Sequence, residues 1–170
     1  MIQTALQHLV LYLDFDGVLH EENVRWSIKR GIYMATPGHH LWEWMSILEE
    51  LLAPFPDVKI VLSTSWVHAR NFNYAKSRLS PALQSRVIGA TFHRREMRQD
   101  VFLSYSRGWQ IAGDVSRRRP RAWFALDDDT EGWPAHLLEN LVATDGTRGL
   151  SDPAVQAAVT EKLRQLSTGM

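Results

Sequence analysis

Five short runs of consecutive apolar residues constrain the fold of this 170-residue chain more than any other feature. The runs are "HLVLYL" (8–13), "VKIVLST" (58–64), "RVIGATF" (86–92), "AWFAL" (122–126) and "LVAT" (141–144). Strands that are apolar on successive residues are typical of sheets covered on both faces, as parallel sheets are. We therefore expect these runs to form a mainly parallel sheet.

Four other segments have the residue spacing of amphipathic helices. They are residues 37–55, 66–79, 107–115 and 151–166. The last begins with Ser151 or Asp152 as a capping residue and has Pro153 in its first turn. Strands that alternate with helices predict an α/β sandwich. The length is that of one domain, which we expect over residues 1–170.

The composition is that of an ordinary globular protein. Lysine and arginine together number 19, as do aspartate and glutamate, so no overall charge predicts a nucleic-acid or membrane partner. The absence of cysteine excludes disulfides and thiolate zinc sites. No run approaches the roughly 20 apolar residues of a membrane span, and residues 1–13 lack the basic leader of a secretory signal. We therefore expect a cytoplasmic protein without a membrane partner.

Two carboxylates follow the first apolar run directly, in "LVLYLDFDGVLH" (9–20). Ligands of open α/β sheets bind beyond the carboxyl ends of the strands, where Asp14 and Asp16 are expected to lie. Gly17 allows a tight backbone turn after them. Carboxylates this close repel one another unless one is protonated or a cation lies between them. Mg²⁺, which prefers oxygen ligands and retains water or substrate phosphate, is the expected cation.

Polar residues also follow two of the other runs, although a lone Asp-x-Asp pair is common in ordinary turns. Residues 63–65 place three hydroxyls at the end of the second run, next to a helix start where an anion is favoured. Residues 127–129 place three more carboxylates after the fourth. Each feature alone fits a helix cap or a solvated turn. Together, the three strand ends predict a site at one edge of the sheet.

The motifs "DFDGV", "LSTSW" and "ALDDD", in this order, resemble those of the haloacid dehalogenase (HAD) superfamily of phosphohydrolases. They span residues 9–131, most of the chain. The resemblance implies a Rossmann-like three-layer α/β/α sandwich and a phosphatase. Through "STSW", "LDDD" and "GLSD", the chain is also similar to the small HAD domains of bacterial RNA-repair proteins.

The resemblance implies the following catalytic roles. Asp14 would attack phosphorus and form an aspartyl-phosphate, which divides one difficult displacement into two easier ones. Asp16 would protonate the leaving oxygen and then activate water, while its backbone carbonyl binds the metal. Asp127 and Asp128 would complete the Mg²⁺ shell, with Asp128 as the preferred direct ligand.

The phosphoryl group would be held by the polar residues that follow the first two runs. Thr64 aligns with the hydroxyl of the family, and Ser63 replaces it if the alignment is shifted by one residue. Gly17 and Ser65 would add further contacts to the substrate.

The family usually has a lysine at its third motif, and no lysine stands at the matching place in this chain. Arg107, in "SRGW", is the preferred substitute because an arginine can bind a phosphate with two hydrogen bonds. Arg95, Arg117 and Arg118 are the alternatives.

Many family members cover the site with a cap domain, but the insertion after the first motif is short here. The flap, at about residues 18–38, is long enough for a hairpin only, so we expect an open site. Capless members often act on nucleotide or macromolecular phosphates, so a nucleotide or an RNA or DNA end is the expected substrate. Basic and aromatic residues in the flap (Arg25, Trp26, Lys29, Arg30) and in "FHRREMR" (92–98) fit nucleic acid, with ordinary surface charge as the alternative.

Three other functions use similar residues. A nucleotide-sugar glycosyltransferase also has an Asp-x-Asp pair, but it predicts a larger chain and no need for Thr64. A receiver-like signalling domain forms an aspartyl-phosphate on an Asp that follows a middle strand, and none follows the second run directly. A phosphate-binding module without turnover would not need both Asp14 and Asp16.

Overall fold

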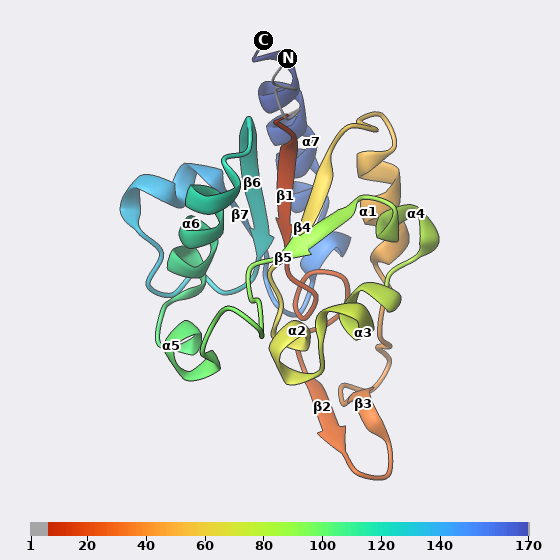
Figure 1. Ribbon diagram of the computed structural model, residues 1–170. Helices are drawn as coiled ribbons and strands as arrows, with labels where there is room; N and C mark the ends of the chain where they lie inside the picture. Colours follow the sequence, from red (N-terminus) through yellow and green to blue (C-terminus); the bar gives the residue numbers. More distant parts are fainter. Residues whose placement is uncertain (1–6, 170) are drawn as a thin grey trace.

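The computed structural model describes residues 7–169 and contains a five-stranded parallel sheet (Figure 1). Residues 1–6, nearly half of the segment that was expected to lack a basic leader, lie outside the described residues. The strands of this sheet are β1 (Leu9–Leu13), β4 (Lys59–Leu62), β5 (Val87–Ala90), β6 (Ala122–Asp127) and β7 (Leu141–Ala143). Each lies within or almost within one of the five apolar runs, so the predicted sheet is confirmed.

The strand order is β5-β4-β1-β6-β7. Numbered along the chain within this sheet, the order is 3-2-1-4-5, as in Rossmann-like folds, and its direction reverses between β1 and β6. Leu13 pairs with Leu62 on one side and with Leu126 on the other, so β1, β4 and β6 end at the same level. The residues that follow these three strands are thereby brought to one edge, at the place where such sheets bind ligands.

Helices cover both faces of the sheet, which confirms the three-layer α/β/α sandwich. Successive side chains of β1 point to opposite faces. Those of Leu9, Leu11 and Leu13 pack in the larger core with α1 (Met45–Leu52) and α7 (Pro153–Thr168). Those of Val10 and Tyr12 pack in a smaller core with Ile111 of α6 (Arg107–Arg118) on the opposite face.

A buried polar contact fixes α6 against β1. The Tyr12 hydroxyl donates to Asp114 Oδ2 at 2.7 Å, and Arg118 Nε donates to the same oxygen at 2.8 Å. Burial, with the neighbouring Asp114 carboxylate, raises the pKa of Tyr12 far above its usual value, so the hydroxyl keeps its proton. This contact helps to set the position of α6, whose first residue is Arg107.

The helices depart from the predicted ranges in three places. Residues 66–79 form two helices, α2 (Ser65–Ala69) and α3 (Phe72–Ser77), because Asn71 is extended and caps α3 through the Tyr74 N–H. In the range 37–55, only α1 is α-helical, and Trp42 before it has a φ of 68°. The third predicted helix continues to Arg118 as α6. Four short helices were not predicted: α4 (Pro81–Gln84), α5 (Gln99–Leu103), η1 (Ala135–Asn140) and η2 (Gly149–Ser151).

An antiparallel hairpin extends beyond the carboxyl end of the sheet. It consists of β2 (Val24–Ser27) and β3 (Gly31–Met34), within the range predicted for the flap. Figure 1 shows it below the sheet, on the same side as α2 and α5 and opposite the start of β1. Within residues 7–169, none of the helices combines the length and the apolar character that spanning a membrane would require.

Candidate active site

Three carboxyl groups converge at the edge where β1 and β6 end. They belong to Asp14, Asp127 and Asp128, and one oxygen of each lies within 4.8 Å of the others. Asp14 and Asp127 are buried, with 4% and 1% of their surface exposed. The predicted convergence of the first and last acidic motifs is therefore present in the structure.

Gly17 makes this convergence possible. Its φ is +75°, which favours glycine, and a Cβ at this position would overlap the Asp128 carboxylate. The turn is also held from β7, since the hydroxyl of Thr144 donates to the carbonyl of Gly17 at 2.7 Å. Thr144 N–H in turn donates to the carbonyl of Asp127 at 3.0 Å, which joins both acidic segments.

Neighbouring donors orient the two buried carboxylates. Asp14 Oδ1 accepts from the Phe15 N–H at 2.8 Å, and Asp127 Oδ1 accepts from the Asp129 N–H at 2.9 Å. The guanidinium of Arg107 lies 3.7 Å from Asp14 Oδ1 and 3.6 Å from Asp127 Oδ2. Asp127 Oδ2 is buried and accepts no hydrogen bond from any residue between 7 and 169.

The pKa values of these carboxyl groups reflect crowding. Burial raises the pKa of Asp14, and the positive charge of Arg107 opposes this shift. Burial and the nearby Asp14 charge raise the pKa of Asp127 well above its usual value. The same two causes raise the pKa of Asp128 to about 7. The single positive charge of Arg107 is thus insufficient to compensate for the negative charges of three carboxylates.

The donor set fits a magnesium ion. Three carboxylates and one guanidinium leave two net negative charges when all are ionised. The unpartnered oxygen of Asp127 needs a donor or a cation, and carboxylate oxygens are ligands that Mg²⁺ prefers. Among residues 7–169, these three therefore form the group whose side chains could hold a metal together.

The side chain of Asp16 lies outside this group and is held by two other residues. Its Oδ1 accepts from the Trp66 indole N–H at 2.8 Å and lies 2.9 Å from His20 Nε2. Because the Trp42 N–H donates to His20 Nδ1 at 3.2 Å, Nδ1 acts as an acceptor and Nε2 carries the proton toward Asp16. Both contacts occupy one oxygen of Asp16, and within residues 7–169 the other oxygen accepts no hydrogen bond.

The polar residues after β4 lie beside the acidic cluster. The Ser63 N–H donates to the Leu13 carbonyl at 2.8 Å, and the Ser63 carbonyl accepts from Arg107. The Thr64 hydroxyl caps α2 through the Trp66 N–H. Thr64 and Ser65 also line a cavity of about 220 Å³, together with Arg107 and Asp129. We call this cavity the mouth of the site.

Among the four basic candidates, Arg107 is the one that contacts the acidic cluster. Arg118 is bound to Asp114 on its own helix, at 2.8 Å. Arg117 is half exposed and 3.9 Å from the same carboxylate. Arg95 is exposed on the segment before α5.

Three residues of the site were missed at the level of sequence. His20 and Trp66 both lie inside quoted motifs, "LDFDGVLH" and "LSTSW", but their contacts with Asp16 depend on side-chain directions. Thr144 ends the fifth apolar run, and its place at a strand end was the one available signal.

Comparison with protein families identifies the family of the chain. Residues 10–155 match the family model described as the HAD domain in Swiss Army Knife RNA repair proteins. The chain belongs to this family. Searches of curated proteins and of solved structures return no match. Membership implies phosphohydrolase-type activity on a phosphorylated substrate, and HAD enzymes generally use Mg²⁺, which the cluster of Asp14, Asp127 and Asp128 could hold.

Proposed function

We propose that this HAD domain is a Mg²⁺-dependent phosphomonoesterase that acts through an aspartyl-phosphate on Asp14. The preferred substrate is the phosphate of a nucleotide or of an RNA or DNA end. The observation that carries the proposal is the convergence of Asp14, Asp127 and Asp128 around the guanidinium of Arg107.

In the first step, a carboxylate oxygen of Asp14 attacks phosphorus, and the bond from phosphorus to the leaving oxygen breaks. The bond of Asp14 Oδ1 with the Phe15 N–H fixes the direction of this carboxylate. Asp16 gives its proton to the leaving oxygen from the carboxyl oxygen that Trp66 and His20 leave free.

In the second step, Asp16 takes a proton from water, and the oxygen of that water attacks phosphorus. The bond from phosphorus to Asp14 then breaks, which releases inorganic phosphate and restores both carboxyl groups. Arg107, with Thr64 and Ser65 at the mouth, holds the phosphoryl oxygens during both steps. When bound, Mg²⁺ supplies positive charge that screens Asp14 and the phosphate from one another.

The test is the release of phosphate from a panel of substrates in Mg²⁺ or in EDTA. The panel contains nucleotides, sugar phosphates and oligonucleotides phosphorylated at the 3′ or the 5′ end. Wild type is compared with Asp14→Asn, Asp16→Asn and, as a matched control, Asp152→Asn at the cap of α7. We expect Mg²⁺-dependent release that either of the first two substitutions abolishes and the third retains.

Two results would contradict different parts of the proposal. Release that survives Asp14→Asn would exclude the covalent mechanism. A preference for sugar phosphates over nucleic acid would exclude the proposed nucleotide or polynucleotide substrate, but it would leave the aspartyl-phosphate mechanism in place.

A further inference from the structure

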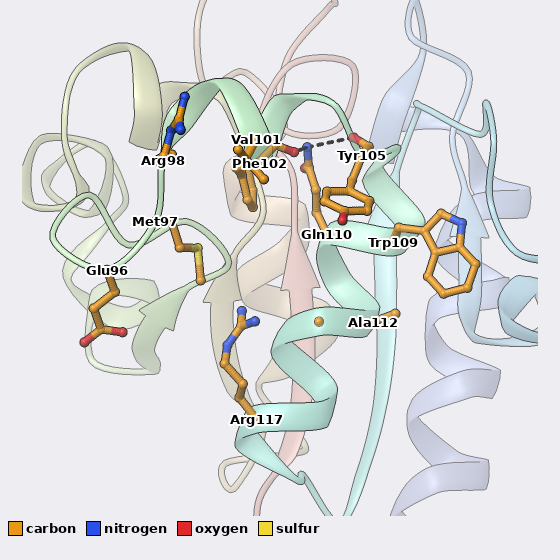
Figure 2. Close-up of a pocket in the computed structure, with 11 residues that line it drawn as sticks. Glu96, Met97, Arg98, Val101, Phe102, Tyr105, Trp109, Gln110, Ala112 and Arg117 are labelled. Atoms are coloured by element: carbon orange, nitrogen blue, oxygen red, sulfur yellow. Dashed lines mark hydrogen bonds between the residues drawn. The ribbon is translucent and has the colours of Figure 1, made fainter.

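An apolar groove lies beside the mouth of the site, between α5 and α6 (Figure 2). Its volume is about 590 Å³, within the range of ligand pockets. The apolar and aromatic side chains in its lining are all at least partly exposed, namely those of Met97, Val101, Phe102, Tyr105, Trp109 and Ala112. We call this feature the α5–α6 groove.

The groove and the mouth are contiguous. Phe102, Tyr105 and Gln110 line both of them, so Tyr105 stands at their boundary. The Gln110 amide donates to the carbonyls of Phe102 and Tyr105, both at 3.1 Å, and so fixes the backbone that carries the Tyr105 ring. A molecule whose phosphate enters the mouth would therefore place its next group against Tyr105.

The floor of the groove is a helix position without a side chain. Gly113 lies inside α6, where glycine costs about 1 kcal/mol relative to alanine. A Cβ there would meet only the movable guanidinium of Arg117 within 4 Å, so close packing does not require the glycine. It instead leaves a low floor between Trp109 and Arg117, one helical turn to each side, which only the flexible Arg117 guanidinium covers.

The segment that carries the groove is rich in arginine. Residues 93–121 contain eight arginines and three acidic residues: Arg94, Arg95, Arg98, Arg107, Arg117, Arg118, Arg119 and Arg121 against Glu96, Asp100 and Asp114. Glu96, Arg98 and Arg117 line the groove itself. Arg98 is paired with Asp100 at 2.6 Å, so Arg117, with 50% of its side chain exposed, is the lining arginine that we expect to bind a phosphate. Figure 2 shows Tyr105 at one end of the groove and Arg117 at the other.

We propose that the α5–α6 groove binds a single-stranded polynucleotide, with one base stacked on Tyr105 above Gly113 and a backbone phosphate on Arg117. Exposed aromatic rings beside cations are the combination that binds single strands, and bases of a duplex could not enter such a groove. This proposal rests on the proposed function, since it places the terminal phosphate in the mouth.

The spacing along α6 favours a strand over a free nucleotide. Arg107 and Arg117 are ten residues apart on one helix, which corresponds to about 15 Å along its axis. A phosphate bound at Arg107 and another bound at Arg117 must therefore belong to a molecule with several phosphates in sequence, as a polynucleotide strand has.

Binding is measured by fluorescence anisotropy with a labelled single-stranded decanucleotide, with and without a terminal phosphate, in EDTA so that no turnover occurs. Gly113→Leu fills the groove, and we expect it to weaken binding about tenfold, as we expect of Tyr105→Ala. Gly113→Ala is the matched control at the same position of α6, and Arg164→Ala on the exposed face of α7 is the control for lost charge. We expect both to retain wild-type affinity. Arg117→Ala is expected to reduce the slope of log binding constant against log salt concentration by about one, because one counterion fewer is released.

Loss of binding in these variants would not come from unfolding. Both Gly113 substitutions raise helix propensity, and we expect neither to lower the melting temperature. Equal binding by wild type and Gly113→Leu, or no binding by wild type, would overturn the proposal. So would a wild-type dimer, detected by sedimentation, that Gly113→Leu converts to monomer, because the groove would then hold a second copy.

Hydrolysis of glycerol phosphate, which is too small to reach the groove, separates this proposal from the proposed function. If all variants hydrolyse it but bind the oligonucleotide equally, the groove proposal fails alone. If wild type releases phosphate from no ester of the panel, including glycerol phosphate, while binding still depends on Gly113 and Tyr105, the phosphatase proposal fails and polynucleotide binding by the groove stands.

Discussion

The indole N–H of Trp66 donates to Asp16 Oδ1 at 2.8 Å, although the two residues are 50 positions apart in the chain. The contact joins the start of α2 to the loop after β1. It fixes the direction of the carboxyl group that we propose as the general acid and base.

Replacement of Trp66 by phenylalanine would remove this donor and keep an aromatic ring in the core. We expect kcat to fall about tenfold with KM nearly unchanged, because the acid is no longer held in place. The loss should be larger for glycerol phosphate than for p-nitrophenyl phosphate, whose leaving group needs no proton. Trp44→Phe, in another buried indole position, is the matched control. Equal losses on both substrates would show that Trp66 only supports the fold.

Sequence patterns predicted the acidic cluster because its members stand at the first or second position after an apolar run. In a parallel sheet, the ends of such runs meet at one edge whatever the details of the loops. The contacts of Asp16 could not be predicted in this way, since they depend on where the Trp66 and His20 side chains point. The division of residues 66–79 into two helices was missed for a related reason, as the capping role of Asn71 interrupts an otherwise continuous helical pattern.

Substitution of Gly17 tests the close approach of the first and last acidic motifs. Gly17→Ala would force a side chain into a backbone region with positive φ and against the Asp128 carboxylate. We expect a loss of roughly 1–3 kcal/mol in unfolding free energy and weaker Mg²⁺ binding. Denaturant unfolding and calorimetric titration measure the two effects. Gly31→Ala, with positive φ but open space around it, is the control, and it should lower stability without changing Mg²⁺ affinity.

Metal-free protein should become less stable as the pH rises from about 4 to about 7. The pKa values of Asp14, Asp127 and Asp128 are raised in the folded state, that of Asp128 to about 7, whereas an unfolded Asp titrates near 3.9. The folded state therefore binds more protons in this window, so stability is lost as they dissociate.

Thermal unfolding in EDTA at several pH values measures this loss. Asp128→Asn is expected to flatten the pH dependence, and Mg²⁺ to stabilise the wild type more strongly at the higher pH, because protons and metal compete for the same oxygens. A metal-free stability that rises over this window would contradict the account.

The most direct test of the central claim is to trap the covalent intermediate. Protein is mixed with radiolabelled phosphate ester and Mg²⁺, quenched in acid, and digested for peptide mapping. We predict a label on the peptide that contains Asp14, released by hydroxylamine as expected for an acyl phosphate, and absent from Asp14→Asn. Turnover by wild type at full rate with the label on another residue, or unchanged turnover by Asp14→Asn, would contradict the account.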